Sequence, residues 1–312
     1  MALARKLLLA ASTNVWLRDH ATKTAFVRRS VSAFMPGEHL NDALTAARAQ
    51  QQLRIGTIFT HLGENVASVD DARAVAAHYV QVMDAVQSGG LNAQIAVKPT
   101  HLGLDVDASL ARQQLRQLVT HAEATDNFVW LDMESSPYVD RTLDLFRDLR
   151  ERSSRVGVAL QAYLHRTADD IERLLPLGAA IRLVKGAYLE PPTLAFPNKR
   201  DVDENFFALA CRLLIGGQSA PAGSLLHIAT HDGVLVDRLQ TFIDSHGLPR
   251  SAYEFAMLYG IQRPLQTRLV NAGAPLRVLI AYGPHWFPWY MRRLAERPAN
   301  VGFVVRNLVR DD

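Results

Sequence analysis

The sequence predicts an α/β fold, a (β/α)8 barrel of the TIM type, on two observations. Eight short apolar runs alternate along the chain with longer stretches that have helical spacing. Each run is almost continuously hydrophobic, as expected of a parallel strand that is buried on both faces. A doubly wound sheet is the alternative, but it usually has a glycine-rich turn after its first strand, and here that strand leads into THLGEN. The barrel is therefore the favoured fold.

The predicted strands follow one another at regular intervals. They lie within LRIGTIFTHLG, NAQIAVKPTHLG, NFVWLDMESS, RVGVALQAYL, AAIRLVKGAYL, SLLHIATHD, AYEFAMLYG and RVLIAYG. All are short and rich in branched or aromatic side chains, which suit a pleated sheet. Eight segments of this kind are the number that closes a TIM barrel.

The stretches between these strands carry apolar residues at helical spacing. Helices are predicted over 70–87, 107–124, 137–151, 201–215 and 233–244. Asp70, Asp107 and Thr167 stand where N-cap residues are expected, because their side-chain oxygens can accept hydrogen bonds from the first helical turn. A last predicted helix contains WYMRRLAERPAN, after an aromatic run at 286–290 that is expected to serve packing rather than ligand stacking.

The chain divides into an N-terminal helical arm, residues 1–50, and a barrel domain, residues 51–312. No internal repeat, low-complexity tract or linker interrupts the second part, and 48% hydrophobic residues in 312 support one large core. Residues 1–54 contain eight basic and three acidic side chains, a net charge of +5. This excess is consistent with peripheral contact to anionic lipid, although a solvated arm is the favoured interpretation.

Composition excludes several classes of protein. Thirty-four basic against 31 acidic side chains give a net charge of +3 without a long basic stripe, so no nucleic-acid partner is predicted. Cys211 is the single cysteine, which excludes an internal disulfide and a cysteine-based zinc site and fits a reducing compartment; it is expected to fill the core. RKLLLAA is too short for a secretion signal, and no stretch approaches 18 apolar residues, so a cytoplasmic protein is predicted.

Polar residues gather at the predicted C-terminal ends of the strands, where TIM barrels place their chemistry. They are Lys98, Asp132, Glu134, Gln161, Arg182, Lys185, Thr230, His231 and Asp232. One polar strand end is routine, but so many together indicate a charged mouth that binds a ligand. Because a lone buried charge is costly, Lys98 and Asp132 are expected to lie near each other or near a ligand if both point inward. The alternative is that one of them is solvated at the rim.

The segment IRLVKGAY combines cations with small residues. Arg182 and Lys185 are three residues apart, so they face opposite ways on an extended chain. Gly186 and Ala187 would let a ligand approach the backbone. This combination suits a phosphate or an electron-rich ring, whereas the alternative is an ordinary barrel strand with a solvent-facing lysine.

The segment HIATHD permits four interpretations. A metal site at His227, His231 and Asp232 lacks a third ligand at suitable spacing, so no metal is predicted. A serine nucleophile is disfavoured because the chain has no Gly-x-Ser-x-Gly turn. Hydrogen bonding of Thr230 and His231 to a cofactor is favoured, and simple packing is the alternative.

Four motifs together resemble the proline dehydrogenase family: RLVKGAY, THD, YEF and RRLAERPAN, over about residues 50–310. The resemblance is to the short monofunctional bacterial members. It implies a distorted barrel that holds FAD without a covalent bond and a last helix that lies over the barrel mouth. It also implies oxidation of L-proline to Δ1-pyrroline-5-carboxylate by hydride transfer, with the electrons passed to a membrane quinone. The protein would then be cytoplasmic, with peripheral contact to the inner membrane.

The resemblance assigns substrate-binding residues by position. Arg292 and Arg293 match the pair that binds the substrate carboxylate, with Lys98 as the third cation. Paired guanidiniums suit this role because each can make directional double hydrogen bonds to a carboxylate. Glu296, one turn after Arg292, would orient them, and Asp132 would balance Lys98.

Cofactor contacts are implied in the same way. Arg182 matches the arginine near flavin N5, where it would stabilise the negative charge that arrives with the hydride. Leu258 corresponds to an apolar wall near the ring. The remaining implied contacts are Gln161, Val184, Lys185, Gly186, Ala187, Tyr188, Lys199, Thr230 and His231.

One position departs from the family pattern. Leu279, in RVLIAYG, stands where the family usually has a tyrosine that packs on the proline ring, and Tyr282 is expected to face the other way. Leucine keeps an apolar wall but removes a hydroxyl group. The same chemistry on hydroxyproline or another cyclic or N-alkylated amino acid is therefore one alternative. A non-catalytic barrel that binds a carboxylate ligand is another, whereas a folate-reducing flavin barrel is disfavoured by the paired arginines.

Overall fold

In the computed structural model, eight parallel strands close into a barrel in the order in which they follow along the chain. The structure describes residues 31, 34–220 and 224–296. The strands are β1 (Gly56–His61), β2 (Ala93–Val97), β3 (Val129–Leu131), β4 (Val156–Gln161), β5 (Ala180–Val184), β6 (Leu226–Ala229), β7 (Tyr253–Leu258) and β8 (Leu276–Tyr282). Seven of them lie within the predicted strand segments, and β8 begins one residue before its segment, at Leu276. The (β/α)8 prediction is confirmed.

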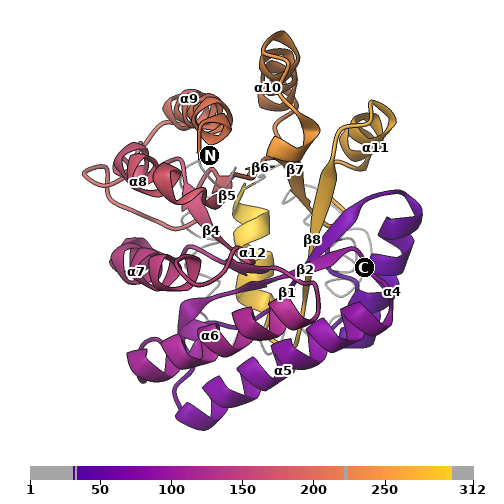
Figure 1. Ribbon diagram of the computed structural model, residues 1–312, viewed down its shortest axis with the longest axis vertical. Coiled ribbons are helices and arrows are strands. Elements are labelled where there is room, and N and C mark those ends of the chain that lie inside the picture. The colour runs from indigo at the N-terminus through magenta and orange to yellow at the C-terminus, as the bar shows by residue number, and fades with distance from the viewer. Residues whose placement is uncertain (1–30, 32–33, 221–223, 297–312) are drawn as a thin grey trace, which may run out of the picture.

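Helices surround the strands (Figure 1). They are α4 (Leu40–Gln52), α5 (Val69–Ser88), α6 (Ala108–Ala124), α7 (Val139–Arg150), α8 (Thr167–Leu174), α9 (Lys199–Gln218), α10 (Gly233–Ser245), α11 (Arg263–Asn271) and α12 (Trp286–Glu296). Short 3-10 helices are η1 (Pro99–Leu102), η2 (Ser136–Tyr138), η3 (Leu175–Leu177) and η4 (Arg250–Ala252). The five helical ranges predicted above correspond to α5, α6, α7, α9 and α10.

Helix starts were predicted less well than helix positions. Asp107 caps α6 as expected, because its carboxylate accepts hydrogen bonds from two backbone N–H groups of the first turn. Asp70 was the wrong choice for α5, since the hydroxyl of Ser68 accepts the capping hydrogen bond instead. Thr167 was also wrong as an N-cap. It is already inside α8, and its hydroxyl donates to the carbonyl of Gln161 at 2.6 Å.

The two faces of the strands have different chemistry. Outward-facing residues such as Ile95, Val158 and Ile280 form one continuous apolar core with the surrounding helices. A separate small cluster, Ile58, Ala96, Trp130 and Ala180, lies inside the barrel. The interior also contains charged side chains, among them Arg182 and Arg277. The outer layer accounts for the nearly continuous hydrophobicity of the strands, and the inner layer accounts for its polar interruptions.

Helix α12 lies over the barrel mouth, as predicted (Figure 1). Its aromatic residues Trp286, Phe287, Trp289 and Tyr290 are buried in a cluster that includes Leu62 and Ala281, which follow β1 and end β8. The indole N–H of Trp286 donates to Glu38 at 2.9 Å. The aromatic run therefore attaches the helix to the barrel, which is the packing role expected for it.

Most of the predicted arm, residues 1–50, falls outside the described residues. Within it, α4 packs on β1 and β8, and its Ala43 and Ala47 are wholly buried. Cys211 is half-buried against the main core, as expected, and burial raises the pKa of its thiol to about 11.

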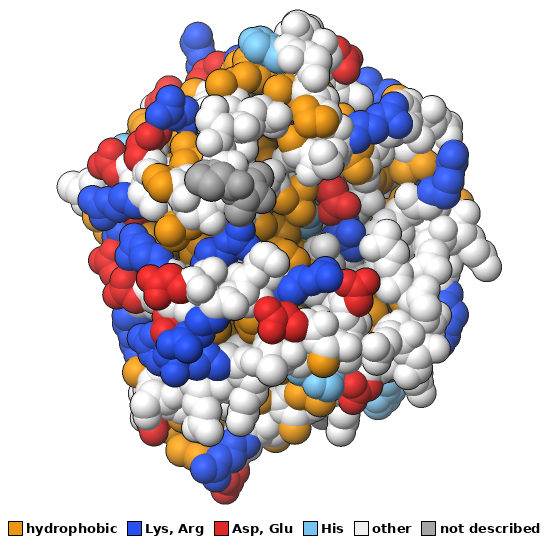
Figure 2. All heavy atoms as spheres, viewed as in Figure 1, with side chains coloured by type: hydrophobic (Ala, Val, Ile, Leu, Met, Phe, Trp, Pro, Cys, Tyr) orange, Lys and Arg blue, Asp and Glu red, His pale blue; other side chains and the backbone are white. Residues whose placement is uncertain are grey.

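The surface carries both signs of charge. Figure 2 shows acidic and basic side chains interspersed over the face in view, without a field of one sign. Many of these charges form ion pairs, such as Arg238 with Glu204. None of the helices in 34–220 and 224–296 combines the length and the apolar character that a membrane span requires.

Candidate active site

The inward-facing strand ends bring most of the predicted site residues together. Gln161 is in register with Val184, and Leu258 is in register with Leu279, so each pair shares one face of the sheet. Asp132 directly follows β3 and reaches Arg182 of β5 across the interior. Residues far apart in the sequence therefore line one space at the C-terminal end of the barrel.

Arg182 is the central cation of this interior. Its guanidinium is 3% exposed, forms an ion pair with Asp132, and lies 5.4 Å from the ring centroid of Trp130. Burial lowers the pKa of Arg182, and the charge of Asp132 opposes this effect. Its Nη1 is buried and has no hydrogen-bond partner among the described residues. One donor of a fixed, buried guanidinium is therefore available to a ligand.

Asp132 was expected to balance Lys98, but the ion pair that the structure gives it is with Arg182. Lys98 is half-buried at the start of η1, and in the described part of the chain its side chain makes no hydrogen bond or ion pair. Its charge contributes to lowering the pKa of the neighbouring His101. Lys98 thus brings to the rim of the mouth a positive charge that is not held in an ion pair by another described residue.

Glu134 lies beside this lysine and is 3% exposed. Burial raises its pKa, although two hydrogen bonds from Thr100 act in the opposite direction. The backbone N–H and the hydroxyl of Thr100 donate to its two oxygens at 3.1 and 2.6 Å. The carboxyl group of Glu134 therefore fixes the β2–η1 segment that carries Lys98.

Gln161 is held in one orientation. Its Nε2 donates to the backbone carbonyls of Met133 and Glu134, each at 3.2 Å. Its Oε1 is buried and has no hydrogen-bond partner within the described residues. Because the amide nitrogen is already used, the amide presents an acceptor to the interior.

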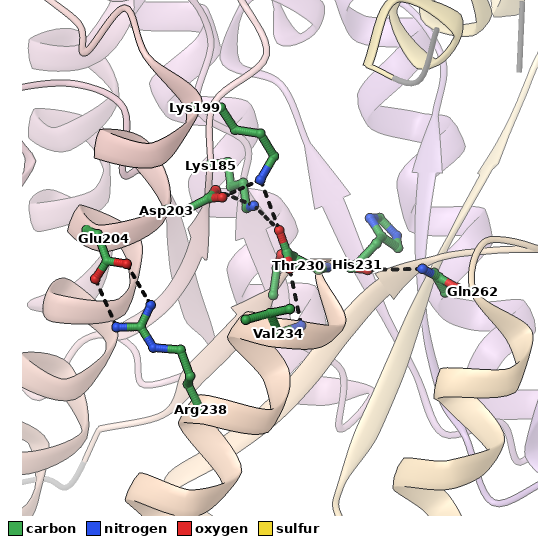
Figure 3. A network of polar contacts seen from close by, with 10 residues as sticks. Lys185, Lys199, Asp203, Glu204, Thr230, His231, Val234, Arg238 and Gln262 are labelled. Atoms are coloured by element: carbon green, nitrogen blue, oxygen red, sulfur yellow. Dashed lines mark hydrogen bonds and ion pairs between the residues drawn. The ribbon is translucent and has the colours of Figure 1, made fainter. Parts of the chain in front are cut away.

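Lys185 and Lys199 share two carboxylates outside the barrel interior, as Figure 3 shows. Each lysine pairs with both Asp203 and Asp232, and their distances to Asp232 Oδ2 are 3.0 and 3.1 Å. Although burial raises the pKa of Asp232, the two lysines lower it to about 2. Arg182 pairs inside the barrel, so the prediction that the two cations of IRLVKGAY face opposite ways is confirmed.

The local structure explains why position 186 is a glycine. Its φ is +117°, and a Cβ atom there would lie 2.2 Å from the ring of Tyr163. A side chain at this position would therefore displace the tyrosine. Ala187 and Tyr188 follow in the half-buried loop between β5 and α9.

Thr230 and His231 lie in the turn between β6 and α10, and His231 also contacts β7. The ring Nε2 of His231 accepts a hydrogen bond from the backbone N–H of Leu258 at 2.8 Å, and its carbonyl accepts from Gln262 at 3.4 Å (Figure 3). The hydroxyl of Thr230 accepts from the backbone N–H of Asp232 at 3.2 Å. These bonds fix the turn that closes the lysine–aspartate network.

The metal interpretation of HIATHD finds no support in this geometry. His227 lies deep in the barrel, where its Nε2 is 2.9 Å from Glu254. His231 instead lies in the β6–α10 turn, where its ring accepts the hydrogen bond from the backbone of Leu258. Across the described ranges, no group of histidine, cysteine and acidic side chains is arranged to hold a metal ion.

Leu279 forms an apolar wall between α12 and the barrel interior. It is half-buried and packs against both the α12 aromatic cluster and the inner cluster that contains Trp130. Tyr282 faces the surrounding helices, and its hydroxyl lies 2.8 Å from Nε2 of His78 on α5. The prediction that Tyr282 faces the other way from Leu279 is confirmed.

Arg292, Arg293 and Glu296 lie on α12, but their side chains fall outside the described part of the structure. Their assigned roles therefore stay predictions. Sequence reasoning missed Trp130, which was treated as an apolar strand residue. The available signal was its position two residues before Asp132, which places both side chains on the same face.

Comparison with known proteins agrees with this geometry. The family model for proline dehydrogenase matches residues 43–306. Proline dehydrogenase 2 of Bacillus subtilis subsp. natto is 34% identical over 99% of this chain and 100% of its own length. Proline dehydrogenase of Deinococcus radiodurans is 35% identical over 89% of both chains.

Solved structures show the same barrel. Proline utilization A (PutA) from Bdellovibrio bacteriovorus superposes with a TM-score of 0.77 and 22% identity over 86% of this chain. This chain spans about a third of the PutA chain, 32% of its length, so the likeness concerns the fold of that part. The family model and the full-length bacterial relatives show the family as well as the fold. The chain belongs to the proline dehydrogenase family.

Proposed function

We propose that this protein is an FAD-dependent proline dehydrogenase that oxidises L-proline to Δ1-pyrroline-5-carboxylate and passes the electrons to a quinone. Family membership over nearly the whole chain carries this proposal. The full-length relatives are named proline dehydrogenases, which favours L-proline over hydroxyproline and over a non-catalytic barrel despite Leu279. The domain division, with an arm over 1–50 and a flavin-binding barrel over 51–312, belongs to the same proposal.

The interior of the barrel fits a flavin. Arg182 Nη1 is a buried donor and Gln161 Oε1 is a buried acceptor, and neither has a partner among the described residues. A flavin ring offers both acceptor nitrogens and an N–H donor, so it satisfies both atoms. Without such a ligand, the burial of each of these two atoms would cost about 1–3 kcal/mol in desolvation free energy.

The remaining proposed cofactor contacts lie along the rim of the barrel mouth. Lys185 and Lys199 would bind the pyrophosphate or the adenosine end, in exchange for part of their contact with Asp203 and Asp232. The other residues proposed to line the cofactor are Val184, Gly186, Ala187, Tyr188, Thr230, His231 and Leu258. When bound, the flavin supplies the hydride acceptor, and the protein supplies orientation and charge.

The substrate would bind between α12 and the strand ends. Arg292, Arg293 and Lys98 would bind the carboxylate, and Glu296 would orient the arginines. Leu279 and the aromatic cluster of α12 exclude water from the substrate ring.

The charges of the site then have distinct roles. Lys98 and the arginine pair hold the carboxylate end of proline, which fixes the ring carbon next to nitrogen at a constant position. Proline must bind with a neutral nitrogen, because its lone pair assists departure of the hydride and gives an imine. Arg182, paired with Asp132, keeps a positive charge where electron density arrives.

The electron acceptor and the location are also proposals. A membrane quinone fits a flavin enzyme that carries a basic N-terminal segment, with a net charge of +5 in residues 1–54. We infer a cytoplasmic protein that contacts the inner membrane peripherally. Sedimentation with anionic and with neutral vesicles tests the contact, and reduction of a soluble quinone by proline tests the acceptor.

The decisive experiment measures proline oxidation with a dye acceptor. Purified protein is expected to be yellow and to prefer L-proline over trans-4-hydroxy-L-proline, pipecolate and sarcosine. Arg292→Met and Arg293→Met should each raise the KM for proline at least about tenfold, or about 1.4 kcal/mol, with unchanged FAD content. Arg238→Met, which removes a surface ion pair with Glu204, is the matched control. A colourless protein that takes up no FAD would contradict the proposal.

A further inference from the structure

Trp130 is the largest side chain inside the barrel, and it is fixed on several sides. It is wholly buried, and its indole N–H donates to Gln94 Oε1 at 2.7 Å. The ring centroid of His227 lies 4.2 Å away. Gly157 makes room for it, since a Cβ atom there would lie 2.5 Å from the indole ring. The indole therefore has one position in the barrel.

The face of this fixed indole meets Arg182. The guanidinium carbon lies 5.4 Å from the ring centroid, within the range of a cation–π interaction. Asp132 binds Nη2 of the same guanidinium, and Nη1 has no partner among the described residues. A single ion pair holds one end of a guanidinium and leaves its plane free to turn. The indole supplies the second support that fixes the plane.

We propose that Trp130 is a positioning residue for the redox reaction and acts through Arg182. This inference rests on the proposed function, because Arg182 is assigned there to the electron-accepting ring. Trp130 holds the guanidinium so that Nη1 stays directed to the cofactor. It also stabilises the charge of a buried cation that, among the described residues, is paired with a single carboxylate. Trp130 itself touches neither substrate nor cofactor in this assignment.

The position of the contact predicts which kinetic parameter depends on it. The proposed carboxylate-binding cations come from α12 and from Lys98, whereas Trp130 supports the cation on β5. Loss of the indole should therefore lower kcat and leave the KM for proline nearly unchanged. A positive charge beside the flavin favours its reduced, negatively charged form, so displacement of Arg182 should also lower the flavin midpoint potential.

Three variants test the inference in the FAD-loaded protein. Trp130→Leu removes the aromatic face, and Trp130→Phe keeps an aromatic face without the N–H group. Phe128→Leu is the matched control, because Phe128 lies on the same side of the same chain segment and packs on the inner cluster. No contact between Phe128 and Arg182 is found in the described residues. The leucine variant should lose at least about tenfold in kcat with a KM within about twofold. The phenylalanine variant should retain most of the activity and potential.

The midpoint potential separates positioning from a merely structural role. It should fall in Trp130→Leu and stay near the wild-type value in Trp130→Phe and Phe128→Leu. In an Arg182→Lys background, Trp130→Leu should have little further effect on kcat, because coupled residues are not additive. If Trp130→Leu is not recovered as folded protein, Trp130→Met replaces it. Equal losses of kcat in all three variants, or an unchanged flavin midpoint potential in Trp130→Leu, would overturn the inference.

The same readout separates this inference from the proposed function. A wild-type protein that binds FAD but does not oxidise proline contradicts the proposed function, and the potentials still decide the role of Trp130. A wild-type protein that binds no FAD contradicts both.

Discussion

His101 allows a quantitative prediction of pH-dependent stability, because its imidazole is buried where a charge cannot be solvated. It lies on η1, is 4% exposed, and stacks on His61 with ring centroids 5.6 Å apart. Gly63 packs so closely that a Cβ atom there would lie 2.2 Å from the imidazole Nε2. Burial, and then the charge of Lys98, lower the pKa of His101 to about 3. Its Nδ1 has no hydrogen-bond partner in the described residues.

The sign of the effect follows from the two states. In the unfolded chain the imidazole has a pKa of about 6.5, so the unfolded state binds the proton more tightly than the folded state. Stability is therefore lost as the pH falls below about 6.5. At about pH 5 the unfolded histidine is almost fully protonated and the folded one is neutral. Proton linkage then gives a loss of about 2 kcal/mol between about pH 7 and pH 5 from His101 alone.

His101→Gln tests this magnitude, because glutamine is neutral at both pH values and has a similar reach. The free energy of unfolding, measured with urea under saturating FAD, should fall less with acidification in the variant, by about 2 kcal/mol. His246→Gln is the control, since it removes a histidine from the unfolded chain but from an exposed site at the end of α10. If His246→Gln reduces the pH dependence of the unfolding free energy by the same amount, the effect does not arise from the burial of His101.

A direct titration checks the cause. In protein with labelled histidines, the His101 resonance is identified by its absence from His101→Gln, and it should not move between about pH 8 and pH 5. A titration midpoint near 6.5 would refute the reasoning, because it would show that the folded protein accommodates the imidazolium.

Three other variants probe the barrel. Gly186→Ala should reduce the FAD content of purified protein, because the methyl group would meet the ring of Tyr163 and φ is +117°; normal FAD content would contradict this. Glu254→Gln should cost about 3–5 kcal/mol of unfolding free energy near neutral pH, because it leaves buried Arg277 without its carboxylate. Burial raises the pKa of Glu254, but its partners lower it to about 2, so the difference from wild type should disappear as the pH falls through that value. Leu279→Tyr should cost about 1–3 kcal/mol through crowding of the inner cluster and should favour L-proline over hydroxyproline; an unchanged substrate ratio would remove Leu279 from specificity.

The barrel was predictable because its outer layer repeats one physical requirement. Every strand buries residues such as Ile95, Val158 and Ile280 under helices, so eight apolar segments are visible in the sequence alone. Capping was less predictable. Ser68 and Asp70 are equally plausible caps by type, and the backbone conformation at Ser68 decides between them. Sequence pattern specifies which segments are helical better than it specifies their first residue.

The sequence indicates which charged residues lie at the barrel mouth, but it does not indicate which of them form ion pairs with one another. Asp132 and Arg182 were both expected at the mouth, because each lies toward the C-terminal end of a predicted strand. Which charges meet depends on distances across the barrel, and no local pattern records those distances. Asp132 was therefore assigned to Lys98, whereas the structure pairs it with Arg182. Trp130, which contacts Arg182, was not recognised as a site residue for the same reason.

The two ends of the barrel interior differ in how well their polar groups are satisfied. At the closed end, Arg277 donates to Glu254, to the carbonyl of Thr57 and to Asn92. At the mouth, Arg182 Nη1 and Gln161 Oε1 are as deeply buried but have no partner among the described residues. Natural proteins seldom leave buried polar atoms unsatisfied, because each costs about 1–3 kcal/mol. The closed end is therefore a structural ion network, whereas the mouth is complementary to a polar, planar ligand that the chain itself does not provide.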